Sequence, residues 1–114
     1  MPTYSTKEEV VENMLHDMRE ALAEGQYYFV SRTKNIESLS QLGLTVSDII
    51  DELNELTYAD YRSGPVADRD FPDTDKLWIF KKKICNEVFY IKLKVEYQTN
   101  KIVKVLSFHI DENR

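Results

Sequence analysis

The chain has 114 residues, a formal net charge of −5 and a hydrophobic share of 42%. This length suits one globular domain, and the low number of glycines and prolines excludes disordered and fibrous classes. A single cysteine, Cys85, excludes an internal disulfide and a cysteine-based zinc site. No stretch approaches the roughly 20 apolar residues that cross a bilayer, and no signal-peptide run is present. We therefore expect one cytoplasmic domain over residues 1–114, with no membrane partner.

The first predicted element is an amphipathic helix. Apolar residues recur at three- and four-residue steps over residues 10–22, with charged residues between them. Ser5 and Glu8 have the spacing of a capping box, and Gly25 should end the helix. The stretch QYYFVSR comes next, and its β-forming residues 27–30 predict a short strand.

Two shorter helices and a loop are predicted next. Asn35 is placed to cap a helix that Gly43 closes, and Thr45 or Ser47 is placed to cap another. Each of these helices has one apolar stripe. The stretch SGPVADRDFPDTDK, residues 63–76, contains two prolines, a glycine and many charges, which predicts a surface loop.

From Leu77 onward the hydrophobic period changes to two. The runs LWIFKKKI, VFYIKLKVEY and KIVKVLSFHI are separated by a turn at residues 85–86 or 86–87 and by a turn near residues 99–100. These runs predict a three-stranded antiparallel meander. Helices followed by strands predict an α+β domain.

A short hairpin around Asn86 determines which side chains of the first two runs share a face, because side chains alternate along a strand. Lys82 differs from the other lysines of these runs, because it is predicted to point to the core side. It should lie near an edge of the sheet, where its aliphatic stem can be buried while its ammonium group reaches water. The core side then contains Trp78, Phe80, Ile84, Phe89, Ile91, Leu93 and Val95, and the opposite side contains Lys81, Lys83, Tyr90, Lys92 and Lys94.

The third run adds residues to both sides if residues 99–100 form its turn. Tyr90 then lies opposite His109, whereas a turn shifted by one residue places His109 opposite Lys92 on the same face. With the first turn, Leu106 and Phe108 join the core side, and Val105, Ser107 and His109 join the lysine side.

The lysine side is positively charged in an acidic chain. Residues 79–107 contain seven lysines and two glutamates, a net charge of +5 that leaves −10 for the rest. Lysines can neutralise charge on a phosphate during phosphodiester cleavage, and an unperturbed histidine, with a pKa of about 6.5, exchanges protons at neutral pH. Tyr90 could position a phosphate or stack on a base. A lysine-rich outer face that is merely solvated is the alternative interpretation.

Five stretches occur in order within residues 30–112: LGLTVSDIIDELNELTYADY, SGPVADRDFP, LWIFKKKI, VFYIKLKV and VKVLSFHID. Together they resemble the motility quorum-sensing regulator family of toxins from bacterial type II toxin-antitoxin modules. The resemblance implies a RelE-like fold, with N-terminal helices packed on a curved antiparallel sheet. It also implies a sequence-preferring endoribonuclease that cleaves messenger RNA without a metal or cofactor, and a partner antitoxin with a zinc domain and a helix-turn-helix.

The resemblance also implies roles for single residues. The strand tyrosine of the family matches Tyr90, and the basic residue after its final Ser-Phe pair matches His109, which we expect to act as general acid or base. A non-catalytic module that binds RNA or an acidic protein, and a regulatory subunit, are the competing hypotheses. The predicted catalytic set is His109, Tyr90, Lys81 and Lys92, and the predicted RNA-binding set is Lys83, Lys94, Arg69 and Arg62.

Overall fold

A computed structural model describes residues 6–67 and 76–113 of the chain. Within these residues, no helix is long and apolar enough to cross a membrane. The elements, in chain order, are α1 (Lys7–Ala23), β1 (Tyr27–Phe29), α2 (Thr33–Leu42), α3 (Val46–Asn54), the 3-10 helix η1 (Tyr58–Asp60), β2 (Tyr61–Ala67), β3 (Lys76–Ile84), β4 (Glu87–Tyr97) and β5 (Lys101–Ile110).

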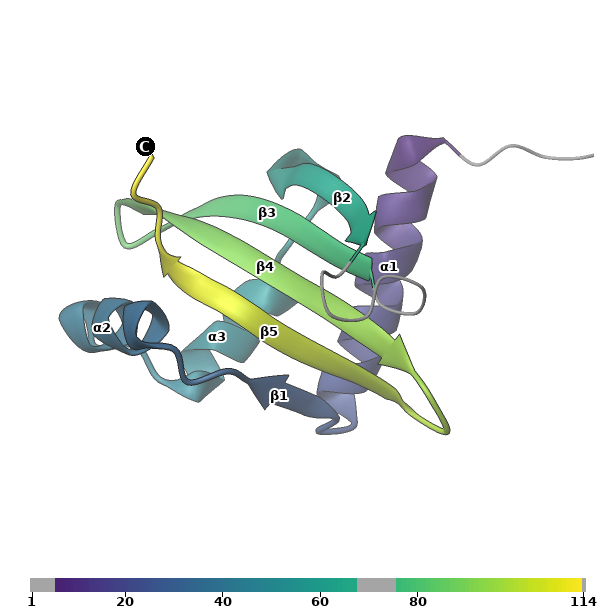
Figure 1. Ribbon diagram of the computed structural model, residues 1–114, viewed down its shortest axis with the longest axis horizontal. Coiled ribbons are helices and arrows are strands. Elements are labelled where there is room, and N and C mark those ends of the chain that lie inside the picture. The colour runs from purple at the N-terminus through teal and green to yellow at the C-terminus, as the bar shows by residue number, and fades with distance from the viewer. Residues whose placement is uncertain (1–5, 68–75, 114) are drawn as a thin grey trace, which may run out of the picture.

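The strands form one five-stranded sheet in the order β1-β5-β4-β3-β2. Strands β3, β4 and β5 form the predicted antiparallel meander, but β1 pairs parallel to β5, so the sheet is mixed rather than antiparallel. Figure 1 shows α1 and α3 against one face of the sheet and α2 beside the C-terminal end of β5. The predicted α+β class is confirmed.

Helix α1 begins one residue later than the predicted cap implies. The side chain of Thr6 accepts a hydrogen bond from the backbone N–H of Glu9 at 3.1 Å, and the predicted cap Ser5 lies outside the described residues. Gly25 comes after the helix with a φ of +72°, a left-handed conformation that favours glycine, as predicted. One stripe of the helix is buried: Val11, Met14, Leu15, Met18, Ala21 and Leu22.

The hydrophobic core lies between this stripe, α3 and the inner face of the sheet. Phe80, Phe89 and Phe108 come from three adjacent strands and are fully buried. Trp78 is 8% exposed and belongs to the core, as predicted. Replacing such an aromatic residue with alanine typically costs about 3–5 kcal/mol, so these positions carry much of the stability of the fold.

The predicted loop over residues 63–76 is partly wrong, because β2 (Tyr61–Ala67) extends into it. β2 is an edge strand, so Pro65, which has no backbone N–H, disturbs hydrogen bonding with only one neighbouring strand, β3. Gly64 has a φ of +116°, and a Cβ atom there would lie 2.6 Å from the backbone oxygen of Leu77, so glycine allows the two strands to approach. The rest of the predicted loop, up to β3, lies outside the described residues.

The hairpin between β4 and β5 departs from the predicted register in two places. The last pair before its loop is Tyr97 with Lys101, so the loop has three residues, 98–100, rather than two. One extra residue, Leu106, then bulges from β5 between two pairs that are adjacent along β4. These pairs are Leu93 with Val105 and Lys92 with Ser107.

Because of the bulge, two residues of β5 lie on the opposite side of the sheet from the predicted one, and the residues beyond them lie on the predicted side. Val105 is 2% exposed and lies in the core, whereas Leu106 is only half-buried, so their predicted sides are reversed. Beyond the bulge, Phe108 is buried and His109 pairs with Tyr90, as predicted. Since side chains alternate along a regular strand, only the bulge lets Val105 and Phe108 face the same core.

Helix α2 covers the edge of β5 where β1 has ended. Asn35 was predicted to cap this helix, but it lies inside α2 and is fully buried. Its Nδ2 donates to the backbone oxygens of Val30 at 2.9 Å and Leu106 at 3.2 Å, and its Oδ1 accepts from the backbone N–H of Phe108 at 3.0 Å. One amide side chain therefore satisfies backbone groups of β5 at the bulged residue and two residues beyond it.

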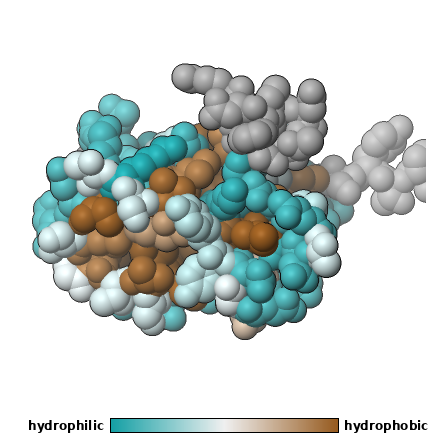
Figure 2. Space-filling model, turned by 60° about the horizontal axis from the view of Figure 1, so that its bottom comes forward, coloured by the Kyte–Doolittle hydropathy of each residue, from teal (hydrophilic) through white to brown (hydrophobic). Residues whose placement is uncertain are grey.

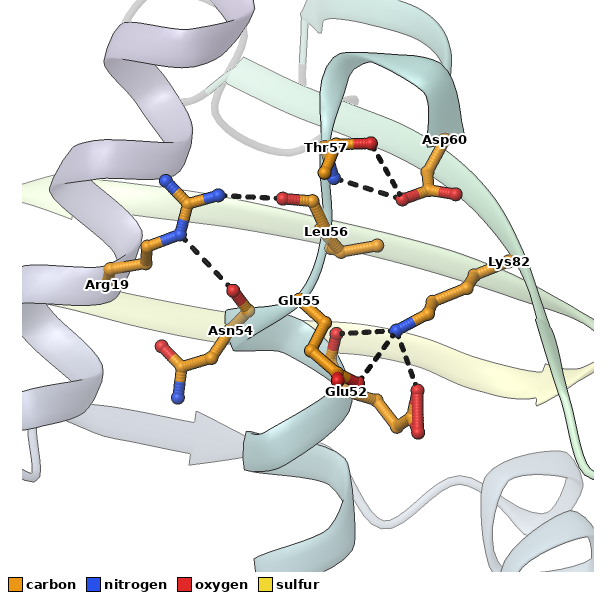
Figure 3. A network of polar contacts seen from close by, with 8 residues as sticks. All are labelled: Arg19, Glu52, Asn54, Glu55, Leu56, Thr57, Asp60 and Lys82. Atoms are coloured by element: carbon orange, nitrogen blue, oxygen red, sulfur yellow. Dashed lines mark hydrogen bonds and ion pairs between the residues drawn. The ribbon is translucent and has the colours of Figure 1, made fainter.

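Lys82 extends from β3 on the core side, as predicted, and reaches the C-terminal end of α3 (Figure 3). Its Nζ lies 2.7 Å from a carboxylate oxygen of Glu52 and 3.2 Å from one of Glu55. Arg19 of α1 donates to the backbone oxygen of Leu56 nearby, at 2.7 Å. Burial opposes the charged form of Lys82, but the two glutamates outweigh it and raise its pKa. Two cations thus complement the negative end of the α3 dipole.

Helices α2 and α3 leave part of their apolar surface uncovered. Figure 2 shows hydrophobic side chains gathered on the side of the molecule where these two helices lie in Figure 1. Ile36 of α2 is 47% exposed and Val46 of α3 is 43% exposed. Part of the exposed apolar surface therefore lies on the outer sides of the two short helices, and exposed apolar or aromatic residues also occur elsewhere, such as Tyr28 of β1 and Val66 of β2.

Candidate functional site

Three strands bring Lys81, Tyr90 and His109 into one row across the sheet. Lys81 pairs with Tyr90 between β3 and β4, and Tyr90 pairs with His109 between β4 and β5. The rings of Tyr90 and His109 stack, with centroids 5.5 Å apart and planes inclined by 25°. The row lies on the face of the sheet opposite the core, where no described helix covers it (Figure 1). The predicted pairing of Tyr90 with His109 is confirmed.

The imidazole of His109 is oriented by its own strand. Its Nδ1 lies 2.9 Å from the backbone oxygen of Ile110. A carbonyl oxygen can only accept a hydrogen bond, so in the neutral ring Nδ1 carries the hydrogen and Nε2 keeps the lone pair. Within the described part of the chain, Nε2 has no hydrogen-bond partner. The ring can therefore accept a proton from a substrate at Nε2.

Lys81 forms an ion pair with a residue that sequence reasoning missed. Its Nζ lies 2.7 Å from Oδ2 of Asp111, which is 4% exposed and comes directly after β5. The backbone N–H of Asp111 donates to the backbone oxygen of Val88 at 2.7 Å, which extends the pairing of β4 and β5 by one residue. Asp111 is two residues beyond His109, so strand alternation already indicated that the two share a face. The carboxylate fixes Lys81 beside the Tyr90–His109 pair.

The charge of Asp111 makes the stability of this corner depend on pH. The ion pair with Lys81 and a hydrogen bond from the backbone N–H of Asn113 lower the pKa of Asp111 below its ordinary value of 3.8. A lowered pKa means that the ionised carboxylate stabilises the fold above the unfolded pKa. This contribution is lost as the pH falls through the lower, folded pKa.

We expect Asp111→Asn to weaken the fold at neutral pH and to make it less sensitive to acid. The variant should be less stable than the parent at pH 7, and the difference in free energy of unfolding should shrink below about pH 4, where carboxylates become protonated. Urea denaturation of both proteins at pH 7 and pH 3 measures this difference. An equal difference at the two pH values would contradict the ionic role of Asp111.

The other predicted strand lysines differ in accessibility. Lys92 lies in the next row along β4, opposite Ser107, and is half-buried, whereas Lys83 is exposed. Successive rows on one face are about 7 Å apart, so Lys92 can reach a phosphate placed at the row of His109. Lys94 is 5% exposed, and its Nζ lies 3.7 Å from Glu96. Lys92 and Lys83 are therefore more accessible to a ligand than Lys94.

Of the two predicted arginines, the structure describes only Arg62, which lies away from this row. Arg62 is exposed on β2, which β3 and β4 separate from β5. Its Nη1 donates to the backbone oxygens of Ala59 at 3.1 Å and Tyr61 at 3.0 Å, so its guanidinium is held beside η1. Arg69 lies outside the described residues. The proposed RNA contacts of both arginines stay predictions.

A cleft of about 400 Å³ opens between α2 and the end of β5, with His109 in its wall. Ser38 of α2 helps to form this wall, because its Oγ accepts a hydrogen bond from the backbone N–H of Ile110 at 2.9 Å. The cleft thus adjoins the Tyr90–His109 pair. Its other polar lining includes Lys34, Glu37, Gln41, Asp111 and Glu112.

In comparisons with known proteins, no family model and no curated protein matched the chain. The candidate site is therefore defined by the row Lys81–Tyr90–His109 and by the adjoining cleft.

Proposed function

We propose that this protein is an endoribonuclease that cleaves RNA at the row formed by Lys81, Tyr90 and His109. The stacked pair of Tyr90 and His109, with Nε2 directed away from the Nδ1 hydrogen bond, carries the proposal. In the reaction, an RNA 2′-oxygen bonds to the adjacent phosphorus and the bond from phosphorus to the 5′-oxygen breaks. The products are a 2′,3′-cyclic phosphate and a 5′-hydroxyl end.

Each group of the row has a separate task in this reaction. Nε2 of His109 accepts the proton of the attacking 2′-hydroxyl, a contribution that is typically worth about 10²- to 10⁴-fold in rate. The leaving 5′-oxygen takes a proton from water. Lys81, within the row, and Lys92, in the next row along β4, stabilise the additional negative charge that the phosphate carries in the transition state. Tyr90 supports the imidazole through stacking and offers its ring to a base.

The distribution of charge over the molecule supports a polyanionic substrate. Lys81, Lys83 and Lys92 lie on the open face of the sheet. The acidic helix α1 packs against the opposite face (Figure 1). A molecule polarised in this way attracts a polyanion to its positive face even though its net charge is −5. An RNA strand would therefore approach the row rather than the helical side.

The resemblance to the motility quorum-sensing regulator toxins gives the proposal its biological setting. Helices on one face of the sheet and a tyrosine and a basic residue on the other agree with what that resemblance implies. We propose that the fold is RelE-like, that the substrate is messenger RNA in the cytoplasm, and that cleavage arrests growth. An antitoxin with a zinc domain and a helix-turn-helix would then neutralise the protein.

The test of this function is cleavage of a defined RNA by the purified protein in excess EDTA. We expect products with 2′,3′-cyclic phosphate ends, because the attacking group belongs to the RNA and the protein residues supply the acid-base chemistry. A matched RNA with a single 2′-deoxy nucleotide at the cleavage position should stay intact. Cleavage of the 2′-deoxy substrate, or full inhibition by EDTA, would refute the mechanism.

A non-catalytic role has one observation in its favour. Asp111 neutralises Lys81, which reduces the positive charge beside His109 and is compatible with a surface that binds RNA without cutting it. Such a module would bind the same RNA in a salt-sensitive manner and leave it intact. The cleavage assay, combined with binding at two salt concentrations, separates the two functions.

A further inference from the structure

The cleft between α2 and the end of β5 shares His109 with the proposed cleavage site. A nucleotide whose phosphate lies at Nε2 of His109 therefore has this cleft beside it. Its volume of about 400 Å³ is at the small end of the range for ligand clefts, which suits a single base. Assigning the cleft to the same RNA substrate depends on the proposed function.

The lining of the cleft disfavours a phosphate. It contains three carboxylates, from Glu37, Asp111 and Glu112, and one ammonium, from Lys34. The Nζ of Lys34 lies 2.7 Å from a carboxylate oxygen of Glu112, and Asp111 is paired with Lys81. The carboxylate of Glu37 is left to give the cleft a negative charge. Such a site repels phosphate and favours a neutral group that donates hydrogen bonds.

Besides Nε2 of His109, the polar groups among the described lining residues that are available to a ligand belong to Glu37 and Gln41. They lie four residues apart on α2, hence on one side of the helix. Among the described residues, neither side chain has a hydrogen bond or an ion pair, whereas the Oγ of Ser38 already accepts from the backbone of Ile110. Glu37 offers acceptors only, and Gln41 offers a donor and an acceptor.

We propose that this cleft binds a base next to the scissile phosphate and selects bases that carry an exocyclic amino group. The amino hydrogens of guanine, adenine or cytosine can donate to the carboxylate of Glu37, and Gln41 can pair with a neighbouring ring or carbonyl group. Uracil has no amino group, and its single imide N–H lies between two carbonyl oxygens that a carboxylate repels. Glu37 is therefore the residue that discriminates against uracil.

The experiment uses a set of RNA oligonucleotides that differ only at the nucleotides flanking the cleavage position. Each flanking position carries each of the four bases in turn. Non-cleavable 2′-deoxy versions at the cleavage position allow binding to be measured separately from cleavage. We expect the parent to disfavour uracil at one flanking position by about ten-fold or more in binding. Glu37→Gln should reduce this preference to about three-fold or less, because the neutral amide presents a donor as well as an acceptor.

Glu112→Gln is the matched control, since it makes the same chemical change in the same cleft at a carboxylate that Lys34 engages. The control should retain the preference of the parent. A parent without any base preference, or equal effects of the two substitutions, would overturn the proposal. Because the readout is a binding ratio on uncleaved RNA, this outcome is distinguishable from failure of the nuclease reaction itself.

Discussion

His109→Ala is expected to slow RNA cleavage by about 10²- to 10⁴-fold. The variant removes the only imidazole of the row, whose Nε2 is left to accept a proton because Nδ1 is hydrogen-bonded to Ile110. His109 is half-buried on the outer face and lies outside the hydrophobic core, so the variant should fold like the parent. Single-turnover cleavage of a labelled RNA in EDTA, together with urea denaturation, measures both quantities.

His16→Ala is the matched control for that experiment. His16 lies on the exposed side of α1, with its Nε2 3.4 Å from Glu20, and should be dispensable for cleavage. Tyr90→Phe keeps the ring that stacks on His109, so any loss of rate in this variant reports the hydroxyl group alone. Equal rates for the two histidine variants would mean that His109 is not the general base.

Asn35→Ala is expected to cost about 3 kcal/mol of stability, since it leaves backbone groups of the bulged residue Leu106 and of Phe108 without their partner. The same variant should cleave RNA more slowly, because the bulge at Leu106 is what directs His109 toward Tyr90. Urea denaturation gives the free energy of unfolding, and the RNA assay is run without urea at a temperature well below the unfolding transition.

Ser38→Ala provides the comparison for Asn35→Ala. Ser38 also lies on α2 and also satisfies β5, but through one hydrogen bond, from the backbone N–H of Ile110. Its loss should cost about 1 kcal/mol and leave the bulge in place. If the two alanine variants had the same stability and the same cleavage rate, the special role of Asn35 would be refuted.

Regular elements were predictable because their signals are local. The helical period of α1, the glycine after it and the capping box at Thr45 each depend on residues within one turn. The meander was predictable for the same reason, since Cys85 and Asn86 adopt positive φ values in a two-residue turn between alternating strands. Strand β2 was missed because an edge strand tolerates proline and glycine, which otherwise mark loops.

The parts of the site that were missed depend on residues far apart in the sequence. Asn35 and Phe108 are 73 positions apart, so nothing local distinguishes the amide that binds β5 from one that caps a helix. The bulge did leave a trace, because Val105 and Leu106 are adjacent apolar residues where alternation predicts one. Asp111 lies one residue past the end of the predicted strand, which like β5 stops at Ile110, so the strand pattern did not include it.

The irregular β5 also affects how molecules of this protein meet one another. An uninterrupted strand rich in valine, isoleucine and phenylalanine is a template on which further chains add and grow into fibrils. Here β1 pairs with only three residues along the outer edge of β5. Beyond them β5 contains the bulge, and its backbone N–H groups donate to the side chains of Asn35 and Ser38 from α2. The hydrogen bonds from α2 that hold the end of β5 therefore also block pairing with another strand, which links resistance to aggregation with the integrity of the cleavage site.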